Sequence, residues 1–222
     1  MKNNLNKSLY LLFTGFILFI NLGFSQNKTI KIRYIGNCGL HITDGENHVY
    51  TDFPYKSGAH HYAEYPQSEL DSLKENAHYI FTHKHSDHYY KGKAKKIIKS
   101  KKGIKYNKKT ISELEEAIPN FKIQVFKTKH LFSFAHYSYL IEWHGQRIFL
   151  SGDTESAETI LKIEDMDVAF IPAWLVREII GSEEKFKTKK IVIYHIGPRD
   201  DVNVKGDRVL MLKQRGQEII LN

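Results

Sequence analysis

Cysteine is almost absent from the 222-residue sequence, which contains Cys38 alone. A single cysteine excludes an intrachain disulfide framework, so a hydrophobic core has to stabilise the fold. Internal repeats, low-complexity tracts and a linker that would separate two domains are also not evident. With 41% hydrophobic and 26% charged residues, the composition is that of an average globular chain that can bury a sizeable core.

Long apolar runs are missing too, with one exception near the N-terminus. Residues 9–20 read LYLLFTGFILFI, with Lys2 and Lys7 before them and the small residues Gly23 and Ser25 behind them. This is the layout of a secretory signal peptide, and the run is short for a membrane span of about 20 apolar residues. We expect residues 1–25 to be removed and residues 26–222 to form a single domain in the periplasm or outside the cell. An uncleaved anchor is the alternative; the lack of a cysteine at the cleavage site disfavours a lipoprotein.

Acidic residues are outnumbered, and the formal net charge is +8. Much of the excess lies in residues 91–109, which contain ten lysines. Such a segment could bind an anionic polymer or a membrane surface. However, aromatic residues that would stack on bases are not interleaved with the lysines, and a solvated helix and loop is the interpretation we favour. No protein partner is predicted.

The first half of the chain alternates strand and helix signals. Ile30, Ile32 and Tyr34 alternate along one side of an extended segment, and an Asp-Gly turn in "DGEN" joins two further strands as a hairpin. Thr110 and Glu113 have the spacing of a helix capping box. We expect strands at residues 29–36, 39–43, 48–53, 77–83 and 103–107, and helices at about 90–101 and from residue 110.

The second half repeats this order of hairpin strands followed by strands and helices. "HG" at residues 144–145 joins the two strands of the second hairpin. Two mixed sheets packed on each other with helices outside would satisfy the pattern, which makes the fold α+β. We expect strands at residues 121–127, 137–143, 146–152, 167–173, 189–195, 208–213 and 217–221, and helices at 155–162 and 174–180.

Four potential metal ligands occur within six residues in the segment "HKHSDH", directly after a predicted strand. His83 and His85 are two residues apart, so in an extended chain both imidazoles point to one side and can share a metal ion. Asp87 and His88 diverge, which suits a second metal beside the first. Imidazole and carboxylate are ligands that zinc, iron and manganese accept.

Two metal shells need more ligands than this cluster supplies. Asp153 follows a strand in "FLSGDTE", His195 follows another in "VIYHIGP", and "KTKHLF" offers His130. Because all three come after apolar strands, they could meet at one rim of the fold. A carboxylate at position 153 could bridge two cations.

In these motifs the chain resembles the metallo-β-lactamase superfamily. "THKHSDH" is similar to the T-H-x-H-x-D-H motif, "GDT" to the later aspartate motif, "YHIG" to the final histidine motif, and "VYTDF" to the early strand that ends in an aspartate, here Asp52. The resemblance runs from about residue 30 to 195 in the family's order. It implies an αββα four-layer sandwich.

The resemblance also implies roles for these residues. His83, His85 and His130 would hold one metal; Asp87, His88 and His195 would hold the other, and Asp153 would bridge the two. Asp52 would orient a ligating histidine. His136 is the alternative to His130. We favour His130 because it lies twenty-three residues before Asp153, a spacing that resembles the family's. The implied cofactor is two divalent ions, zinc first, with manganese or iron as alternatives.

The other histidines are expected at the surface or in the core, and Cys38 is expected to be packed rather than reactive. His60 and His61 are candidates for substrate contact, since the segment after Asp52 can border the cleft in this fold.

The chemistry follows from the ligand set. Two metals that share a water lower its pKa and create hydroxide, which attacks a carbonyl or a phosphorus, while Asp87 orients the nucleophile or carries a proton. No serine triad or phosphate-binding glycine loop competes with this interpretation. We therefore expect a metal-dependent hydrolase that cleaves an ester, lactone or phosphoester in a small-molecule substrate.

The branch of the superfamily is a separate question. Asp153 stands where lactam-cleaving members generally have cysteine or serine, so the chain is more similar to lactonase-like hydrolases, including the ascorbate-6-phosphate lactonase group. The alternatives are a phosphodiesterase acting on nucleic acid or phospholipid, a β-lactamase, a non-haem iron protein that handles oxygen or persulfides, and a metal-stabilised binding protein without turnover.

Overall fold

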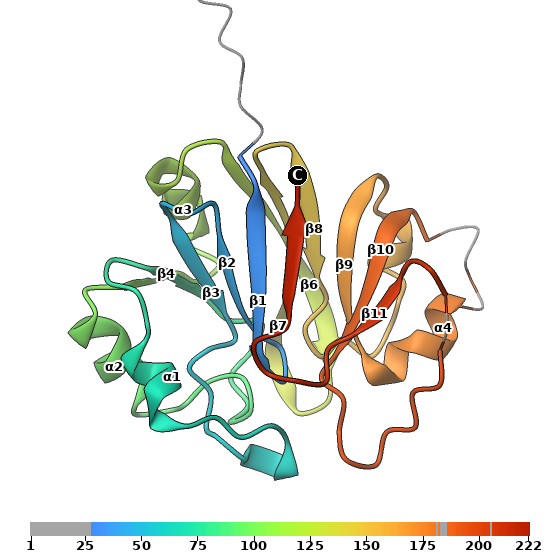
Figure 1. Ribbon diagram of the computed structural model, residues 1–222, viewed down its shortest axis with the longest axis horizontal. Helices are drawn as coiled ribbons and strands as arrows, with labels where there is room; N and C mark the ends of the chain where they lie inside the picture. The colour runs from blue at the N-terminus through green and yellow to red at the C-terminus, as the bar shows by residue number, and fades with distance from the viewer. Residues whose placement is uncertain (1–27, 181, 183–185, 205) are drawn as a thin grey trace, which may run out of the picture.

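Two six-stranded mixed sheets form the centre of the molecule (Figure 1). The computed structural model describes residues 28–180, 182, 186–204 and 206–222. The predicted signal peptide, residues 1–25, lies outside the described residues. In the part of the chain that is described, no helix is long and apolar enough to cross a membrane.

The first sheet has the strand order β12-β1-β2-β3-β4-β5. β1, β2, β3 and β12 pair antiparallel, whereas β4 runs parallel to both β3 and β5. The turn at residues 44–47 joins β2 to β3, as the Asp-Gly signal predicts. The strands are β1 (Ile30–Gly36), β2 (Gly39–Thr43), β3 (His48–Thr51), β4 (His78–Ile80), β5 (Ile104–Lys105) and β12 (Glu218–Leu221).

The second sheet has the order β11-β10-β9-β8-β7-β6. β6, β7 and β8 form an antiparallel meander, and β9, β10 and β11 continue the sheet in parallel. The two halves of the chain thus repeat one plan. The strands are β6 (Phe121–His130), β7 (Ser133–Trp143), β8 (Gln146–Leu150), β9 (Met166–Pro172), β10 (Thr188–Tyr194) and β11 (Val209–Met211).

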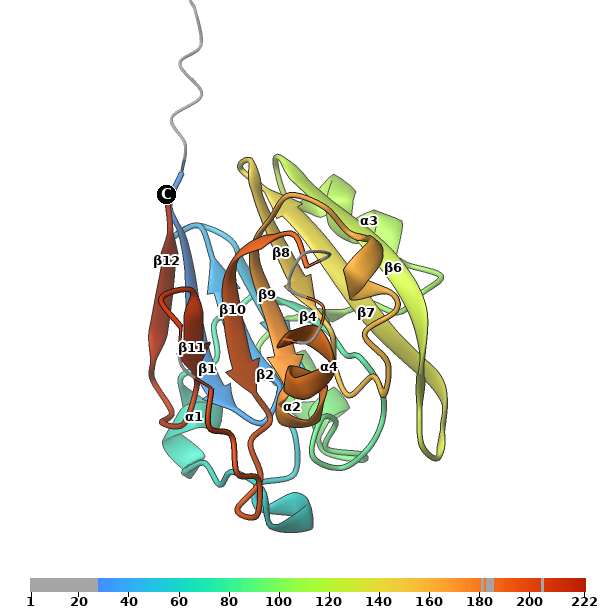
Figure 2. The ribbon, with the colours of Figure 1, turned by 90° about the vertical axis from the view of Figure 1, so that its right-hand side faces the viewer.

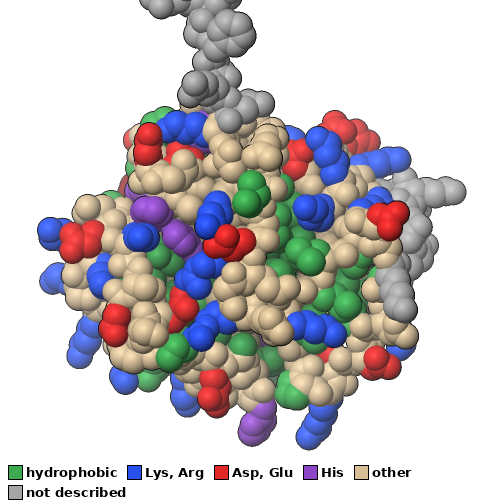
Figure 3. Space-filling view, in the orientation of Figure 1, with side chains coloured by type: hydrophobic (Ala, Val, Ile, Leu, Met, Phe, Trp, Pro, Cys, Tyr) green, Lys and Arg blue, Asp and Glu red, His purple; other side chains and the backbone are tan. Residues whose placement is uncertain are grey.

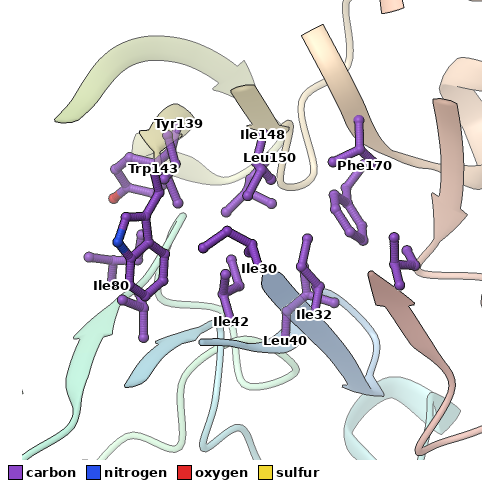
Figure 4. Packing of buried hydrophobic residues seen from close by; sticks show 14 of the residues in the cluster. Ile30, Ile32, Leu40, Ile42, Ile80, Tyr139, Trp143, Ile148, Leu150 and Phe170 are labelled. Carbon is purple, nitrogen blue, oxygen red and sulfur yellow. The ribbon is translucent and has the colours of Figure 1, made fainter. Parts of the chain in front are cut away.

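The main core lies between the sheets. Ile32 and Leu40 from the first sheet face Leu150 and Phe170 from the second, and Trp143 closes one end of this layer (Figure 4). Alternate strand residues therefore point inward, which is the period-2 pattern of the sequence realised in space.

Helices cover the outer faces of both sheets and complete four layers (Figures 1 and 2). Ala94 and Ile98 of α2 pack on the outer face of the first sheet, and Val176 and Ile179 of α4 on that of the second. The predicted αββα sandwich is confirmed. The helices are α1 (Gln67–Asp71), α2 (Ala94–Ser100), α3 (Ile111–Ala117) and α4 (Val176–Ile180), with 3-10 turns η1 (Ala59–His61), η2 (Ile160–Lys162) and η3 (Ala173–Leu175).

Several local predictions were wrong. Residues 155–162 are not a helix, since only the turn η2 forms there. The capping box before α3 is not made: the Thr110 hydroxyl oxygen accepts a hydrogen bond from the Asn107 amide at 3.1 Å, and the Glu113 amide donates to the Thr110 carbonyl instead. β6 and β7 extend to residues 130 and 133 and form one long hairpin whose two-residue turn was not predicted.

A buried histidine, His41, beside the half-buried His48 in the first sheet predicts acid sensitivity. His41 on β2 stacks on Tyr50, with ring centroids 4.5 Å apart, and its Nε2 lies 3.1 Å from His48 Nδ1. Burial, reinforced by His48, lowers the pKa of His41 to about 3. The unfolded chain therefore binds a proton at higher pH than the folded chain, so stability falls as pH drops below about 6.5.

Replacing His41 should reduce the dependence of stability on pH. With His41→Gln, the loss of unfolding free energy between pH 7 and pH 5 should shrink by about 2 kcal/mol, measured by urea denaturation at both values. His61→Gln, which changes an exposed histidine, is the matched control and should retain the native slope. Equal slopes for His41→Gln and the native protein would contradict the prediction.

Candidate metal centre

The sequence-predicted ligands meet at one edge of the sandwich, beyond the carboxyl ends of several strands. Thr82 and His83 follow β4, Asp153 follows β8, and His195 follows β10, while His130 is the last residue of β6. Strand ends are rigid supports for loop residues, and ligands bind preferentially at such edges. The structure brings all seven predicted ligands together: His83, His85, Asp87, His88, His130, Asp153 and His195.

The first cluster consists of His83, His85 and His130. Each offers one ring nitrogen, and these three atoms lie within 4.8 Å of one another. His130 Nε2 is 3.1 Å from His85 Nδ1. Three convergent imidazoles are a common protein donor set for a transition metal.

The second cluster contains Asp87, His88 and His195. The Nε2 atoms of His88 and His195 are 3.1 Å apart, and Asp87 Oδ2 lies 3.3 Å from His195 Nε2. All three side chains are buried. The cluster combines two imidazoles with a carboxylate.

Asp153 lies between the clusters. Its Oδ2 is 3.0 Å from His88 Nε2 and 3.2 Å from His195 Nε2, and 3.9 and 3.8 Å from the Nε2 atoms of His83 and His130. Gly152, with φ 58°, makes this placement possible, because a Cβ there would lie 2.7 Å from the Thr82 Cβ. A single carboxylate oxygen thus faces both groups of ligands.

Asp52 supports the second cluster from behind. Its carboxylate accepts hydrogen bonds from the Thr82 backbone amide and hydroxyl, both at 2.7 Å, and pairs with His88 Nδ1 at 2.9 Å. A carboxylate on the far nitrogen fixes the ring and leaves Nε2 directed at the cluster. This is the position predicted for Asp52.

The charges of the site are strongly coupled. Burial by itself would raise the pKa of Asp153, but His88 and His195 outweigh it and hold that pKa well below its ordinary value. Burial would lower the pKa of His88, but Asp153 and Asp52 raise it well above the usual range. Carboxylates that favour a proton on these rings would equally favour a metal cation.

His136 makes contacts that separate it from His130. Its Nε2 accepts a hydrogen bond from the Asp153 backbone amide at 2.9 Å, and its Nδ1 lies 2.7 Å from the Thr128 hydroxyl. Burial lowers its pKa to about 3. Both ring nitrogens of His136 therefore already have partners, Asp153 and Thr128, whereas Nε2 of His130 faces the cluster.

A cavity of about 510 Å³ opens beside the clusters. His60 lines it, with Nε2 3.0 Å from the Ser86 hydroxyl, but His61 is not among the residues of its wall. Several wall residues were missed by the sequence analysis because nothing in their local sequence marks them. The wall consists of His60, Tyr62, His85, Asp87, His130, Leu131, Phe132, Asp153, Glu155, Trp174 and His195.

Cys38 also reaches the site, from the turn between β1 and β2. Its Sγ lies 3.4 Å from Asp153 Oδ1, and it could join His88, Asp153 and His195 around an ion. Burial raises the pKa of this thiol well above its ordinary value. The structure therefore places Cys38 beside the site rather than in a remote part of the core.

The donor set fits a metal ion. His83 Nε2 is fully buried and has no hydrogen-bond partner among the described residues, although it points toward Asp153. An unpaired buried ring nitrogen costs free energy unless something binds it. A cation in contact with this lone pair and the neighbouring imidazoles would satisfy it, and histidine with aspartate suits zinc, iron or manganese.

The two-sheet sandwich with a histidine and aspartate cluster at its strand ends defines a protein of the metallo-β-lactamase fold with a candidate metal site. The chain belongs to the family described as the beta-lactamase superfamily domain, whose model matches residues 31–197. No curated protein matches the sequence significantly.

Solved structures share the fold at low sequence identity. A metallo hydrolase, Igni18, from Ignicoccus hospitalis is 14% identical with a TM-score of 0.64, covering 87% of this chain and 99% of its own. An isothiocyanate hydrolase from Delia radicum gut bacteria is 13% identical, with a TM-score of 0.57 and coverage of 85% and 98%. CmlA, a diiron β-hydroxylase from Streptomyces venezuelae, is 12% identical, with a TM-score of 0.56 and coverage of 86% and 54%.

Proposed function

We propose that this chain is a metal-dependent hydrolase. The observation that carries the proposal is the convergence of four imidazoles, those of His83, His88, His130 and His195, on one oxygen of Asp153, beside an open cavity. His83, His85 and His130 would hold one divalent ion, and Asp87, His88 and His195 the other. Asp153 would bridge them, and zinc is the first candidate, with manganese or iron as alternatives.

When bound, two such cations act as Lewis acids and bring the pKa of a shared water toward neutrality, which provides a nucleophile. The protein supplies the rest. Asp87 is buried yet lines the cavity, so its carboxylate would orient the nucleophile and take up its proton. His60 lies 3.9 Å from Asp87 Oδ1 and would contact a substrate that enters from the same side.

The cavity supports a small ester or lactone substrate. Among the residues that the structure describes, its wall contains no lysine or arginine, whereas a phosphodiesterase would benefit from cations that bind the phosphate. A lactonase-like activity is therefore preferred to cleavage of nucleic acid or phospholipid. Asp153, in the place of a cysteine or serine, disfavours a β-lactamase.

The lysine-rich segment does not contribute to this cavity. In α2, Lys95, Lys96 and Lys99 are exposed while Ala94 and Ile98 are buried, which is the pattern of a solvated amphipathic helix. On the face shown in Figure 3, basic side chains are interspersed with acidic ones rather than gathered in one patch. We propose that residues 91–109 serve solubility and that the substrate is a small molecule.

A redox function is the second candidate. Histidine and carboxylate ligands also suit iron, and CmlA, which shares the fold, is a diiron enzyme. Oxygen consumption by iron-loaded protein would favour this function.

The test is a substrate panel with metal analysis. The purified protein is loaded with zinc, manganese or iron, its metal content is counted, and it is assayed with lactones, carboxylic esters, thioesters, phosphodiesters and a chromogenic cephalosporin. We expect about two metal ions per chain and cleavage of lactones or esters. Absence of hydrolysis by every fully loaded form would contradict the proposal.

We further propose that the protein acts outside the cytoplasm, in the periplasm or beyond, after removal of residues 1–25. Mass spectrometry of the protein isolated from its native host should give a mature N-terminus near residue 26.

A further inference from the structure

Three large apolar side chains project from the tip of the β6–β7 hairpin. Leu131, Phe132 and Phe134 are 59%, 88% and 99% exposed. Figure 2 shows this hairpin reaching past the ends of the neighbouring strands. Exposed aromatic residues in such a group add nothing to the core, and clusters of this kind usually mark a binding surface.

The backbone conformation of the turn does not favour the aromatic residue Phe132. His130 pairs with Ser133, so Leu131 and Phe132 alone form the turn, and Phe132 has φ 57°. Glycine or asparagine adopts this left-handed conformation at much lower cost than a bulky residue. The fold therefore gains nothing from a phenyl ring at position 132.

Hydrogen bonds connect the hairpin tip to the loop that carries Asp153. The Leu131 amide donates to Glu155 Oε1 at 2.6 Å, and the Glu155 amide donates to the Lys129 carbonyl at 3.1 Å. Glu155 is two residues from Asp153, and His130 immediately precedes the tip. The hairpin tip thus has a fixed position at the mouth of the cavity.

Aromatic side chains form another part of the wall. The Trp174 indole donates to the Thr154 carbonyl at 2.9 Å and packs on His195 with ring centroids 5.3 Å apart. Tyr62 packs edge-on against the same imidazole at 4.3 Å. Leu131 and Phe132 line the cavity as well, whereas Phe134 does not.

We propose that Leu131, Phe132 and Trp174 determine specificity by binding an uncharged apolar group, alkyl or aryl, next to the bond that is cleaved. This inference rests on the proposed hydrolase function and narrows its substrates to apolar esters or lactones. The absence of lysine and arginine from the described cavity wall agrees with an uncharged group, and about 510 Å³ accommodates a chain of several carbon atoms.

Binding can be tested without turnover. Neutral N-alkylacetamides, from ethyl to octyl, are titrated into the purified protein while the fluorescence of half-exposed Trp174 is recorded. Affinity should rise with each methylene, by at most about fourfold, until the cavity is filled. Phe132→Ala should flatten this rise, Phe132→Leu should retain part of it, and Phe134→Ala, which alters an equally exposed phenyl ring outside the cavity, should leave it unchanged.

Two results would overturn the inference. One is an affinity that does not depend on chain length. The other is an equal loss of affinity in Phe132→Ala and Phe134→Ala, which would indicate nonspecific binding to exposed apolar side chains. With metal-loaded protein and p-nitrophenyl esters from acetate to octanoate, kcat/KM should rise with the length of the acyl chain, as the affinity for the amides does. Trp174→Ala should raise KM for the long esters more than for acetate; equal effects on both would also overturn it. If the loaded protein cleaves no substrate of the panel but the amide pattern holds, the hydrolase proposal fails and the apolar binding wall stands.

Discussion

Asp153→Ala should remove at least one metal ion from the purified protein and lower kcat/KM by at least about 100-fold. Its Oδ2 faces ligands of both clusters, with His88 Nε2 at 3.0 Å and His130 Nε2 at 3.8 Å. Without this negative charge, two cations would repel each other more strongly and lose a shared ligand. Metal content by elemental analysis and initial rates on the substrate found in the panel measure the effect.

The matched control is Glu158→Ala. Glu158 is an exposed carboxylate five residues further on that pairs with Lys162 outside the cluster. It should retain native metal content and rate. An Asp153→Ala protein with full metal content and full activity would disprove the bridging role.

Asp52→Ala should lower the free energy of unfolding by about 3–5 kcal/mol, because three hydrogen bonds converge on one buried carboxylate. The substitution leaves the Thr82 amide without its acceptor and His88 Nδ1 with only the Thr82 hydroxyl, 3.4 Å away. Since His88 loses the group that orients it, metal affinity should also fall by about 10–100-fold. Urea denaturation and metal competition with a chelator of known affinity measure the two effects, and Asp52→Asn should show a smaller loss of stability.

Asp44→Ala is the control that separates the loss of stability from the loss of metal affinity. Asp44 is also a buried carboxylate that accepts hydrogen bonds from two backbone amides, those of Glu46 and Asn47, and lies 3.0 Å from His144 Nε2. It lies in the β2–β3 turn, away from the cluster. Asp44→Ala should therefore lose stability but not metal affinity. If both variants lose the same stability and neither loses metal affinity, Asp52 has no role in orienting His88.

The sequence was sufficient for the ligand cluster because its information is local. A strand followed by "HKHSDH" sets the spacing of four side chains whatever the rest of the chain does, and β4 does end at Ile80, shortly before His83. Alternation likewise predicted most strands, because a strand between a core and an outer layer shows its faces in the sequence. Asp153 and His195 could be chosen because each follows an apolar strand.

Other features could not be predicted from local sequence signals. The turn of the β6–β7 hairpin contains none of the usual turn residues, so the strand signals at 121–127 and 137–143 appeared separate. The capping box of Thr110 failed because the hydroxyl oxygen accepts from the Asn107 amide, while the Glu113 amide donates to the Thr110 carbonyl. Helical propensity in residues 155–162 was overridden by the loop that positions Asp153 and Glu155.

The sequence by itself determined the two-sheet class of fold, the order of the motifs and the identity of the candidate ligands, because periodicity and local spacing need no knowledge of distant residues. Only the tertiary structure decided that His130 rather than His136 faces the cluster, since that depends on which nitrogen atoms Asp153 and Thr128 occupy. It also decided that Cys38, Phe132 and Trp174 lie at the site. These residues are far apart along the chain, and the pairing of strands across two sheets is what brings them together.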